Sequence, residues 1–375
     1  MLTRRTQRPC YAAASVALGA LLFAGCGDSD DAPAGATKLS YKLTDAGCDP
    51  AQASAPAGPI TFDVTNDGAS GVTELEVMNG DTILGERENL SDGLSGSFTV
   101  TLDAGTYTVY CPGGDSAERG TLTVTGQSKT SQSGESAAAV DRYRRYIEAQ
   151  SALLIKDTEP FVQAVQSGNV EEAKRLYPDA RLSYERVEPV AESFGNLDPV
   201  IDARAGDVPA SKWSGFHPIE KALWVDNTTQ GMGPVAAKLL DNVKLLQKKV
   251  KTIKLEPAQI ANGANELLGE VSASKITGEE ERYSHTDLWD FEANVEGAKA
   301  AFDADKPLLE QRNPELASEI EQRFSDVEAA LAPYKRGDGF VLYGELTEQD
   351  KRKLARSIDA LGEPLSQVAS IVVQQ

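Results

Sequence analysis

The strongest constraint on the fold is a change in hydrophobic spacing part-way along the chain. Residues 39–125 contain short runs in which apolar and polar side chains alternate, the period of two that is typical of half-buried strands. From residue 140 onward, apolar residues recur every three or four positions, which is the spacing of amphipathic helices. The sequence therefore predicts a small β-sandwich followed by an all-α helical bundle.

Turn residues separate the predicted elements. Strands are expected at residues 40–43, 60–64, 73–77, 98–102, 107–110 and 121–124. Helices are expected at residues 140–167, 170–194, 218–226, 235–252, 257–271, 286–304, 313–333 and 347–373. Residues 126–139, rich in Ser, Gly and Gln, follow neither period and are expected to link the two domains, 39–125 and 140–375.

The charge of the chain limits the partners it can have. With 37 basic and 57 acidic side chains, its formal net charge is −20. This charge argues against nucleic acid or an anionic membrane surface as a partner. An acidic surface suits a protein that binds cations, although it also serves simply to keep a protein soluble.

The N-terminal residues 1–26 have the features of an export signal. Arg4, Arg5 and Arg8 precede an apolar stretch over residues 11–23, which is too short to span a membrane. The stretch ends in Phe-Ala-Gly-Cys26, which resembles the lipobox of bacterial lipoproteins. We therefore expect Cys26 to carry lipid, residues 27–38 to be a tether, and the protein to be extracytoplasmic and anchored to the cell membrane. An ordinary cleaved signal with a chance cysteine is the alternative.

The remaining cysteines lie in the predicted sandwich. Cys10 would leave with the signal and Cys26 would be lipidated, so Cys48 and Cys111 remain. Outside the cytoplasm, two cysteines in one domain usually form a disulfide.

Both histidines of the chain lie in the helical region. His217 precedes Pro218, a residue that fits the first turn of a helix, and Glu220 lies one turn further on the same side. A histidine and a carboxylate at this spacing can reach one cation. A capping histidine beside a surface glutamate is the alternative.

Acidic residues also crowd the predicted helix over residues 170–194. Glu185, Glu188 and Glu192 share one face, and like charges at such spacing destabilise a helix by roughly 0.2–0.5 kcal/mol per pair unless a cation offsets them. Pro189 is expected to kink this helix. Asp202 follows in a loop. Carboxylates with one imidazole suit iron, manganese or zinc better than Cu(I).

Other polar residues and missing motifs narrow the function. His285 and Asp287 form a second polar cluster, for which Thr286 as a helix cap is the simpler interpretation. The chain lacks the His-Glu-x-x-His pattern of zinc proteases, the Glu-x-x-His pairs of di-iron bundles, nucleophile elbows and phosphate loops. The sequence therefore favours a binding protein over an enzyme.

Several segments together resemble a known family. Residues 184–194, 202–204, 215–224, 284–297 and 337–341 are similar to the imelysin-like domain of the EfeO family of bacterial iron-uptake proteins. The resemblance implies a helical bundle that captures iron, as Fe2+ or Fe3+, and delivers it to a membrane permease. It also implies a haem peroxidase of the same uptake system as a further partner. The ligands that the resemblance implies are Glu185, Glu188, Asp202, His217 and Glu220.

The same resemblance leaves two other functions open. Some relatives of the domain are described as alginate binders, so a polysaccharide-binding protein is one alternative, with Trp213, Trp224 and Trp289 as candidate sugar platforms. The second alternative is an imelysin-type metallopeptidase, which the absence of a second histidine near His217 disfavours.

The predicted sandwich resembles the cupredoxin-like module of the same family. An ordinary blue-copper site needs two histidines, and residues 39–125 contain none. The resemblance implies a different site, at Cys48, Glu74 and Cys111, for copper or iron. A disulfide between the two cysteines, with Glu74 on an exposed face, is the competing interpretation.

Overall fold

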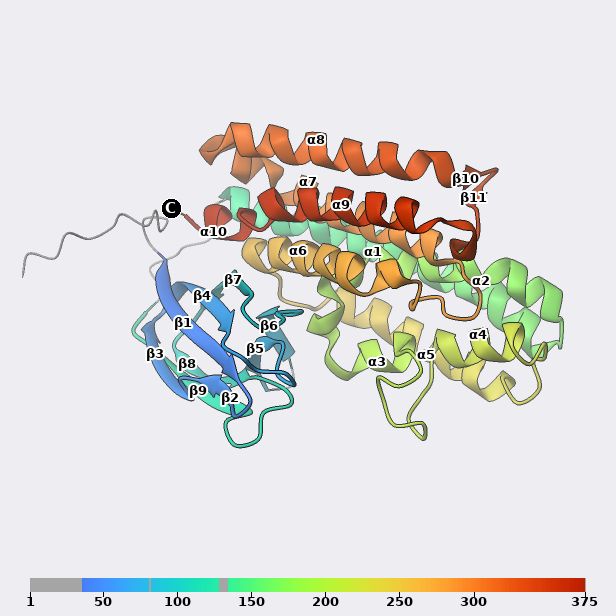
Figure 1. Ribbon diagram of the computed structural model, residues 1–375, viewed down its shortest axis with the longest axis horizontal. Helices are drawn as coiled ribbons and strands as arrows, with labels where there is room; N and C mark the ends of the chain where they lie inside the picture. The colour runs from blue at the N-terminus through green and yellow to red at the C-terminus, as the bar shows by residue number, and fades with distance from the viewer. Residues whose placement is uncertain (1–35, 81, 128–133, 375) are drawn as a thin grey trace, which may run out of the picture. The chain divides into compact units, whose positions relative to one another are not determined.

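The first part of the chain folds into two sheets. In the computed structural model, which describes residues 36–80, 82–127 and 134–374, the strand orders are β2-β1-β4-β7 and β3-β9-β8-β5-β6 (Figure 1). The strands are β1 (Thr37–Thr44), β2 (Gly47–Asp49), β3 (Gln52–Pro56), β4 (Gly58–Asn66), β5 (Leu75–Asn79), β6 (Thr82–Arg87), β7 (Ser95–Leu102), β8 (Gly105–Tyr110) and β9 (Arg119–Thr125). The predicted sandwich is therefore confirmed. The predicted signal peptide, Cys26 and residues 27–35 of the predicted tether lie outside the described residues, whereas Thr37 and Lys38, at the end of the predicted tether, already belong to β1.

Alternating apolar residues hold the two sheets together. Phe62 on β4 faces Phe98 on β7 in register, and their rings stack with centroids 4.9 Å apart. Val77, Val109 and Leu122 from the other sheet complete the same buried cluster. Such cross-strand aromatic and β-branched contacts stabilise a sheet by burying one of its faces.

A disulfide joins the sheets of the sandwich. Cys48 lies on β2, and Cys111 directly follows β8 in the other sheet. Their sulfur atoms are bonded, with the Cα atoms 5.6 Å apart. Of the two interpretations that the sequence left open for these cysteines, the structure contains the disulfide.

The second part of the chain is helical, as predicted. The longest helices are α1 (Gly134–Gln166), α2 (Val170–Glu185), α5 (Gly233–Val250), α6 (Pro257–Ala273), α7 (Asp287–Arg312), α8 (Pro314–Leu331) and α9 (Glu348–Leu365). The shorter ones are α3 (Asp198–Asp202), α4 (Phe216–Trp224), α10 (Val368–Val372) and the 3-10 helices η1 (Glu188–Leu197), η2 (Lys275–Thr277), η3 (Ala332–Tyr334) and η4 (Tyr343–Glu345). A two-stranded ribbon, β10 (Lys335–Arg336) and β11 (Gly339–Phe340), follows η3.

Two predicted helices are divided in the structure. The helix expected over residues 170–194 ends at Glu185, and the 3-10 helix η1 begins at Glu188. Pro189 explains the break, because proline has no N–H to continue the α-helical hydrogen bonds. The helix expected over residues 347–373 is likewise divided into α9 and α10.

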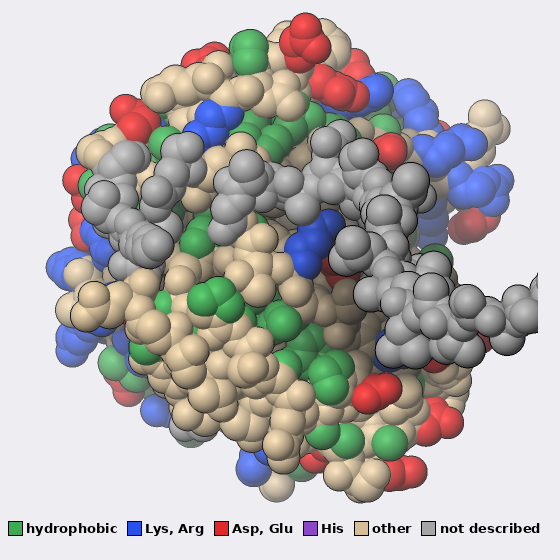
Figure 2. All heavy atoms as spheres, turned by 90° about the vertical axis from the view of Figure 1, so that its left-hand side faces the viewer, with side chains coloured by type: hydrophobic (Ala, Val, Ile, Leu, Met, Phe, Trp, Pro, Cys, Tyr) green, Lys and Arg blue, Asp and Glu red, His purple; other side chains and the backbone are tan. Residues whose placement is uncertain are grey.

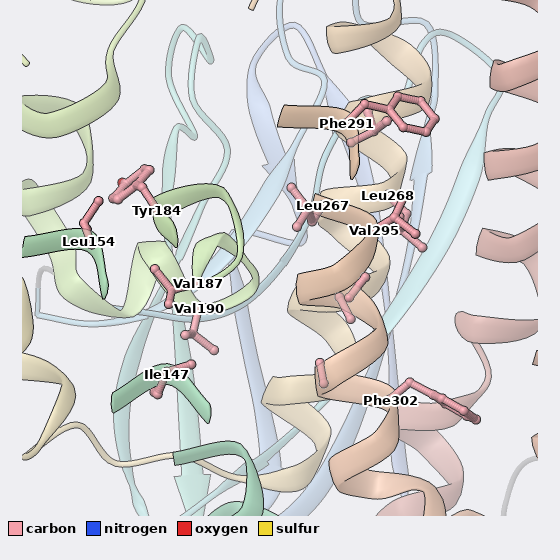
Figure 3. Close-up of a cluster of buried hydrophobic side chains, with 14 of the residues drawn as sticks. Ile147, Leu154, Tyr184, Val187, Val190, Leu267, Leu268, Phe291, Val295 and Phe302 are labelled. Atoms are coloured by element: carbon pink, nitrogen blue, oxygen red, sulfur yellow. The ribbon is translucent and has the colours of Figure 1, made fainter. Parts of the chain in front are cut away.

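The bundle is built around α1, α6 and α7. Helix α1 packs against α2, α5 and α7, and α6 packs against α7 and α9. Figure 3 shows the buried core between them, with these side chains labelled: Ile147, Leu154, Tyr184, Val187, Val190, Leu267, Leu268, Phe291, Val295 and Phe302. Within the described part of the chain, no helix combines the length and the hydropathy that a membrane crossing requires.

The sandwich and the bundle belong to one compact unit and contact each other. Arg87 on β6 forms an ion pair with Glu266 on α6, with Nη1 and Oε1 2.9 Å apart. Asn262, also on α6, donates a hydrogen bond from Nδ2 to the backbone oxygen of Thr99. On the face drawn in Figure 2, charged side chains lie mainly around the margin, so the strong negative charge is not concentrated there.

Candidate metal centre

The start of α4 places His217 inside the bundle. Gly215 precedes the helix with φ +91°, and a Cβ at this position would lie 1.9 Å from the backbone oxygen of Ile201. A residue without a side chain is therefore required for α4 to begin this close to α3. The resulting position buries both His217 and Glu220 almost completely.

Glu220 holds the imidazole of His217 from one side. Nδ1 of His217 lies 3.1 Å from Oε2 of Glu220. The other oxygen, Oε1, accepts hydrogen bonds from the backbone N–H groups of Tyr283 and Ser284 at 2.8 and 2.7 Å. Because both oxygens of Glu220 are engaged, the carboxylate is fixed and Nε2 of His217 faces the opposite way.

Two carboxylates lie on the Nε2 side of the ring. Oδ1 of Asp202, the last residue of α3, is 3.6 Å from Nε2, and Oε1 of Glu280 is 3.7 Å from it. Ligand atoms of Asp202, His217 and Glu280 all lie within 4.8 Å of one another, as do those of His217, Glu220 and Glu281. Side chains from separate segments thus converge on one imidazole.

Arg181 of α2 lies in the middle of these carboxylates. Its side chain has no exposed surface, and its nitrogens form ion pairs with Glu185, Asp202, Glu280, Glu281 and Asp290. Nη1 also lies 3.4 Å from Nε2 of His217. A buried guanidinium of this kind offsets part of the repulsion between the acidic groups.

Lys275 of η2 is the second buried cation. Its Nζ lies 3.2 Å from Oε2 of Glu185 and 2.7 Å from Oε1 of Glu188. Asn294 of α7 donates to the other side of the same pair, to Oε2 of Glu185 at 3.0 Å and Oε2 of Glu188 at 2.6 Å. Although α2 ends between them, Glu185 and Glu188 are therefore held together beside the imidazole cluster.

Burial and charge shift the pKa values of the central groups. Burial and Arg181 lower the pKa of His217, but its contacts with Glu220, Glu280 and Asp202 outweigh them and raise it to about 9. Burial raises the pKa of Asp202 to about 6. For Glu280, the charges of Lys275 and Arg181 and the hydrogen bond with His217 outweigh burial and hold the pKa well below its usual range.

The donor set fits a divalent or trivalent cation. Carboxylate oxygens and one imidazole nitrogen form an oxygen-rich site, which suits iron, manganese or zinc. Bonds of about 2.0–2.2 Å from one ion to each ligand would require the ligand atoms to be roughly 3–4 Å apart. The separations around Nε2 of His217 are already of this order.

The structure brings together the residues that the sequence singled out. Asp202, His217 and Glu220 belong to the groups with converging ligand atoms, and Glu185 and Glu188 contact the same network through Arg181 and Lys275. The five are not scattered over different faces.

Sequence reasoning missed Glu280, Glu281 and the two buried cations. The acidic run at residues 279–281 was the available signal, but it precedes a short turn whose direction the sequence does not reveal. His285 is exposed and lies outside the centre, whereas Asp287 is buried and accepts from the backbone N–H of Glu281 at 3.1 Å. Thr286 precedes α7, but its side chain makes no capping hydrogen bond.

The tryptophans considered as sugar platforms pack within the bundle. Nε1 of Trp213 donates to the backbone oxygen of Ala203. Trp224 packs edge-on against Tyr177, and Trp289 packs edge-on against Phe340. All three are partly buried, so none presents a fully open ring face.

The three residues of the predicted site in the sandwich have different surroundings in the structure. The sulfur atoms of Cys48 and Cys111 bond each other, and both residues are buried. Glu74 lies near Glu88, and burial raises its pKa. A copper or iron ion held through both sulfurs therefore requires the reduced form of the protein.

Glu74 lines a cavity that also reaches the metal centre. This cavity, of about 440 Å³, lies between β-sandwich and bundle. Its acidic lining from the sandwich is Glu74, Glu86 and Glu88. Its acidic lining from the bundle is Glu188, Asp198, Asp202, Asp207, Glu266, Glu270 and Glu280. We call it the acidic cavity.

Comparison with known proteins identifies the family. The sequence profile of the imelysin family matches residues 139–368, and that of the cupredoxin-like domain matches residues 15–124. The iron uptake system component EfeO of Escherichia coli K12 is 39% identical over 345 residues, which cover 89% of this chain and 91% of that protein. The chain belongs to the EfeO family. EfeO of Shigella flexneri matches with the same identity and coverage.

Membership of the EfeO family confirms the resemblance seen in the sequence and the combination of a cupredoxin-like domain with an imelysin-like domain. The matching EfeO proteins are named as iron uptake components and not as peptidases. Among solved structures, a purple cupredoxin from Nitrosopumilus maritimus is 21% identical, with 23% of this chain and 99% of that chain covered and a TM-score of 0.20.

Proposed function

We propose that this protein captures iron outside the cytoplasm and hands it to a membrane permease. Asp202, Glu280 and Nε2 of His217 would bind the ion, as Fe2+ or Fe3+. Glu220 would hold the imidazole, and Glu185 and Glu188 would complete the acidic surroundings. The names of the EfeO relatives support iron as the cargo.

One observation carries this proposal. Asp202, His217 and Glu280 come from α3, α4 and the turn before α7, yet their ligand atoms lie within 4.8 Å of one another. Burying several carboxylates beside an imidazole is costly unless cations compensate them. A protein that binds a multivalent cation has a reason to maintain this arrangement.

The test is calorimetric titration with ferrous iron under anaerobic conditions. The double variant His217→Ala, Glu220→Ala should lose binding at this centre. His285→Ala is the matched control, because His285 is the other histidine of the chain and is exposed. Unchanged iron affinity in the double variant would discard the assigned centre.

Anchoring and partners are further parts of the proposal. Lipid on Cys26 would hold the protein at the outer face of the cell membrane, close to an iron permease and a haem peroxidase of the same uptake system. Cys26→Ser should release the protein from the membrane fraction into the soluble extracytoplasmic fraction. A variant that stays with the membrane after a high-salt wash would exclude this anchor.

A further inference from the structure

The guanidinium of Arg181 binds the same atoms that a metal ion would use. Nη1 contacts Oδ1 of Asp202 and lies 3.4 Å from Nε2 of His217. Nη2 donates to Oε1 of Glu280 at 3.2 Å and to Oε1 of Glu185 at 2.6 Å. The outer edge of the guanidinium therefore covers the three groups that converge at this centre.

An ion and this edge cannot occupy the centre together. An ion about 2.0–2.2 Å from both Nε2 and Oδ1 would lie next to Nη1, which contacts Oδ1 and is 3.4 Å from Nε2. The nitrogen is positively charged and has no lone pair to offer. Sterics and charge both require Nη1 to move before Asp202 and His217 can bind an ion.

The other edge of Arg181 has acidic partners of its own. Nε lies 2.6 Å from Oε1 of Glu281 and 3.6 Å from Oδ1 of Asp290. The second oxygen of Asp290, Oδ2, is buried and has no hydrogen-bond partner among the described residues. If the guanidinium turned away from Asp202, it would find an acceptor in Oδ2 of Asp290 on α7, and it would stay in the protein interior.

We propose that Arg181 is an internal competitor of the cargo, which an arriving cation must displace from Asp202, His217 and Glu280. This inference rests on the proposed function. Arg181 holds the acidic groups together in the absence of the ion and sets the binding strength that an ion must exceed. Ions that bind carboxylates weakly would be excluded, while an ion with higher charge and an affinity for imidazole nitrogen would displace the guanidinium.

The proposal predicts tighter binding when the competitor is removed. Arg181→Gln should raise the affinity for Zn2+, a redox-inert probe, by about tenfold or more, because one unit charge beside the ion opposes binding strongly even at an effective dielectric constant of about 20. Binding of Ca2+ should rise as well, because the same repulsion is removed for every divalent ion. Arg175→Gln is the matched control, since Arg175 lies on the same helix in an exposed ion pair with Glu172.

A purely structural role predicts the opposite result. If Arg181 only maintained the shape of the centre, Arg181→Gln would bind Zn2+ equally or more weakly, and that result would overturn the inference. Circular dichroism and thermal unfolding verify that the variant is folded. A wild-type protein that shows no His217-dependent binding would instead contradict the proposed function, so the two failures are distinguishable.

The wild-type protein provides a second measurement if the variant does not fold. The Nε–Hε signal of Arg181 can be followed by 15N NMR during titration with Zn2+ and assigned by comparison with Arg181→Lys. Displacement predicts a shift of this signal that saturates at one equivalent of Zn2+. A signal that stays in place while His217 binds Zn2+ would refute the exchange.

Discussion

At the scale of single residues, the geometry of Glu220 determines which nitrogen of His217 is available. Glu220 accepts two backbone N–H groups on one oxygen and faces Nδ1 with the other. A carboxylate in this position keeps the proton on Nδ1, so Nε2 is left with a free lone pair when the ring is neutral. Under the proposed function, we therefore expect Glu220 to position His217, and Glu280 to act as a ligand in place of Glu220, for which the family resemblance implied that role.

Replacing the carboxylate by an amide tests this assignment. Glu220→Gln should weaken metal binding by about 10–100-fold, because the amide NH2 favours the wrong tautomer of His217 while preserving the size of the side chain. Calorimetric titration measures the loss, and circular dichroism checks the fold. Full affinity in this variant would show that the tautomer of His217 does not depend on Glu220.

The pKa values predict how binding depends on pH. His217, with a pKa of about 9, is protonated at neutral pH, and an ion can bind Nε2 only after the ring loses a proton. Affinity for Zn2+ should therefore rise by about tenfold per pH unit between pH 6 and 8, and more steeply below the pKa of Asp202 at about 6. Titration in buffers of different ionisation enthalpy counts the protons released. A binding constant that is flat over this range would contradict the protonated state of His217.

At the scale of the elements, α6 supports the segment that carries Glu188. A Cβ at Gly263 would lie 1.7 Å from the backbone oxygen of Pro189, whereas one at Gly269 would meet no atom within 4 Å. The glycine at position 263 therefore lets η1 approach α6 closely, and the one at 269 does not serve such a contact.

Alanine at the two positions should have opposite effects on stability. Gly263→Ala should lower the free energy of unfolding by about 1–3 kcal/mol, since η1 must shift away from α6. Gly269→Ala should raise it by roughly 0.5–1 kcal/mol through the better helix propensity of alanine. Urea unfolding measures the free energy of unfolding of each variant and of the wild-type protein. Equal effects at both positions would show that the approach of η1 to α6 does not limit stability.

The elements also show how far sequence reasoning reaches. Periodicity located the sandwich and the long helices, and Pro189 marked the place where the chain bends. The convergence of His217 with Glu280 depends on a turn between η2 and α7, whose path is set by packing and leaves no periodic pattern. Arg181 was not recognised because a single arginine on a helix does not reveal that carboxylates from three other segments surround it.

At the scale of the whole molecule, the disulfide closes a large loop in the sandwich. Cys48 and Cys111 are 63 residues apart in the sequence. Replacing both by alanine should lower the free energy of unfolding of the sandwich by about 2–5 kcal/mol. Thermal unfolding of the variant measures this loss of stability. In the wild-type protein, thiol titration without reductant should find both cysteines unreactive. Two reactive thiols would revive the metal-binding interpretation of Cys48 and Cys111.

The acidic cavity predicts a contribution of the sandwich to the rate of metal binding. Glu74→Gln with Glu88→Gln should slow association of Zn2+ several-fold at low salt, because carboxylates that line a cavity concentrate cations within it. Asp92→Asn with Asp103→Asn removes two exposed charges that lie outside the cavity lining and should leave the rate unchanged. Stopped-flow measurements give the association rate of Zn2+ for each double variant. Equal slowing in both double variants would show that the association rate depends on the net charge of the protein and not on the carboxylates of the cavity.

Because its walls come from both domains, the acidic cavity would make the fused arrangement itself a functional unit under the proposed function. A helical domain produced alone would keep Asp202, His217 and Glu280, but it would lose the opposite wall that an approaching ion meets. Natural variation that alters the ion pair between Arg87 and Glu266 would therefore change the approach to the centre without touching a ligand.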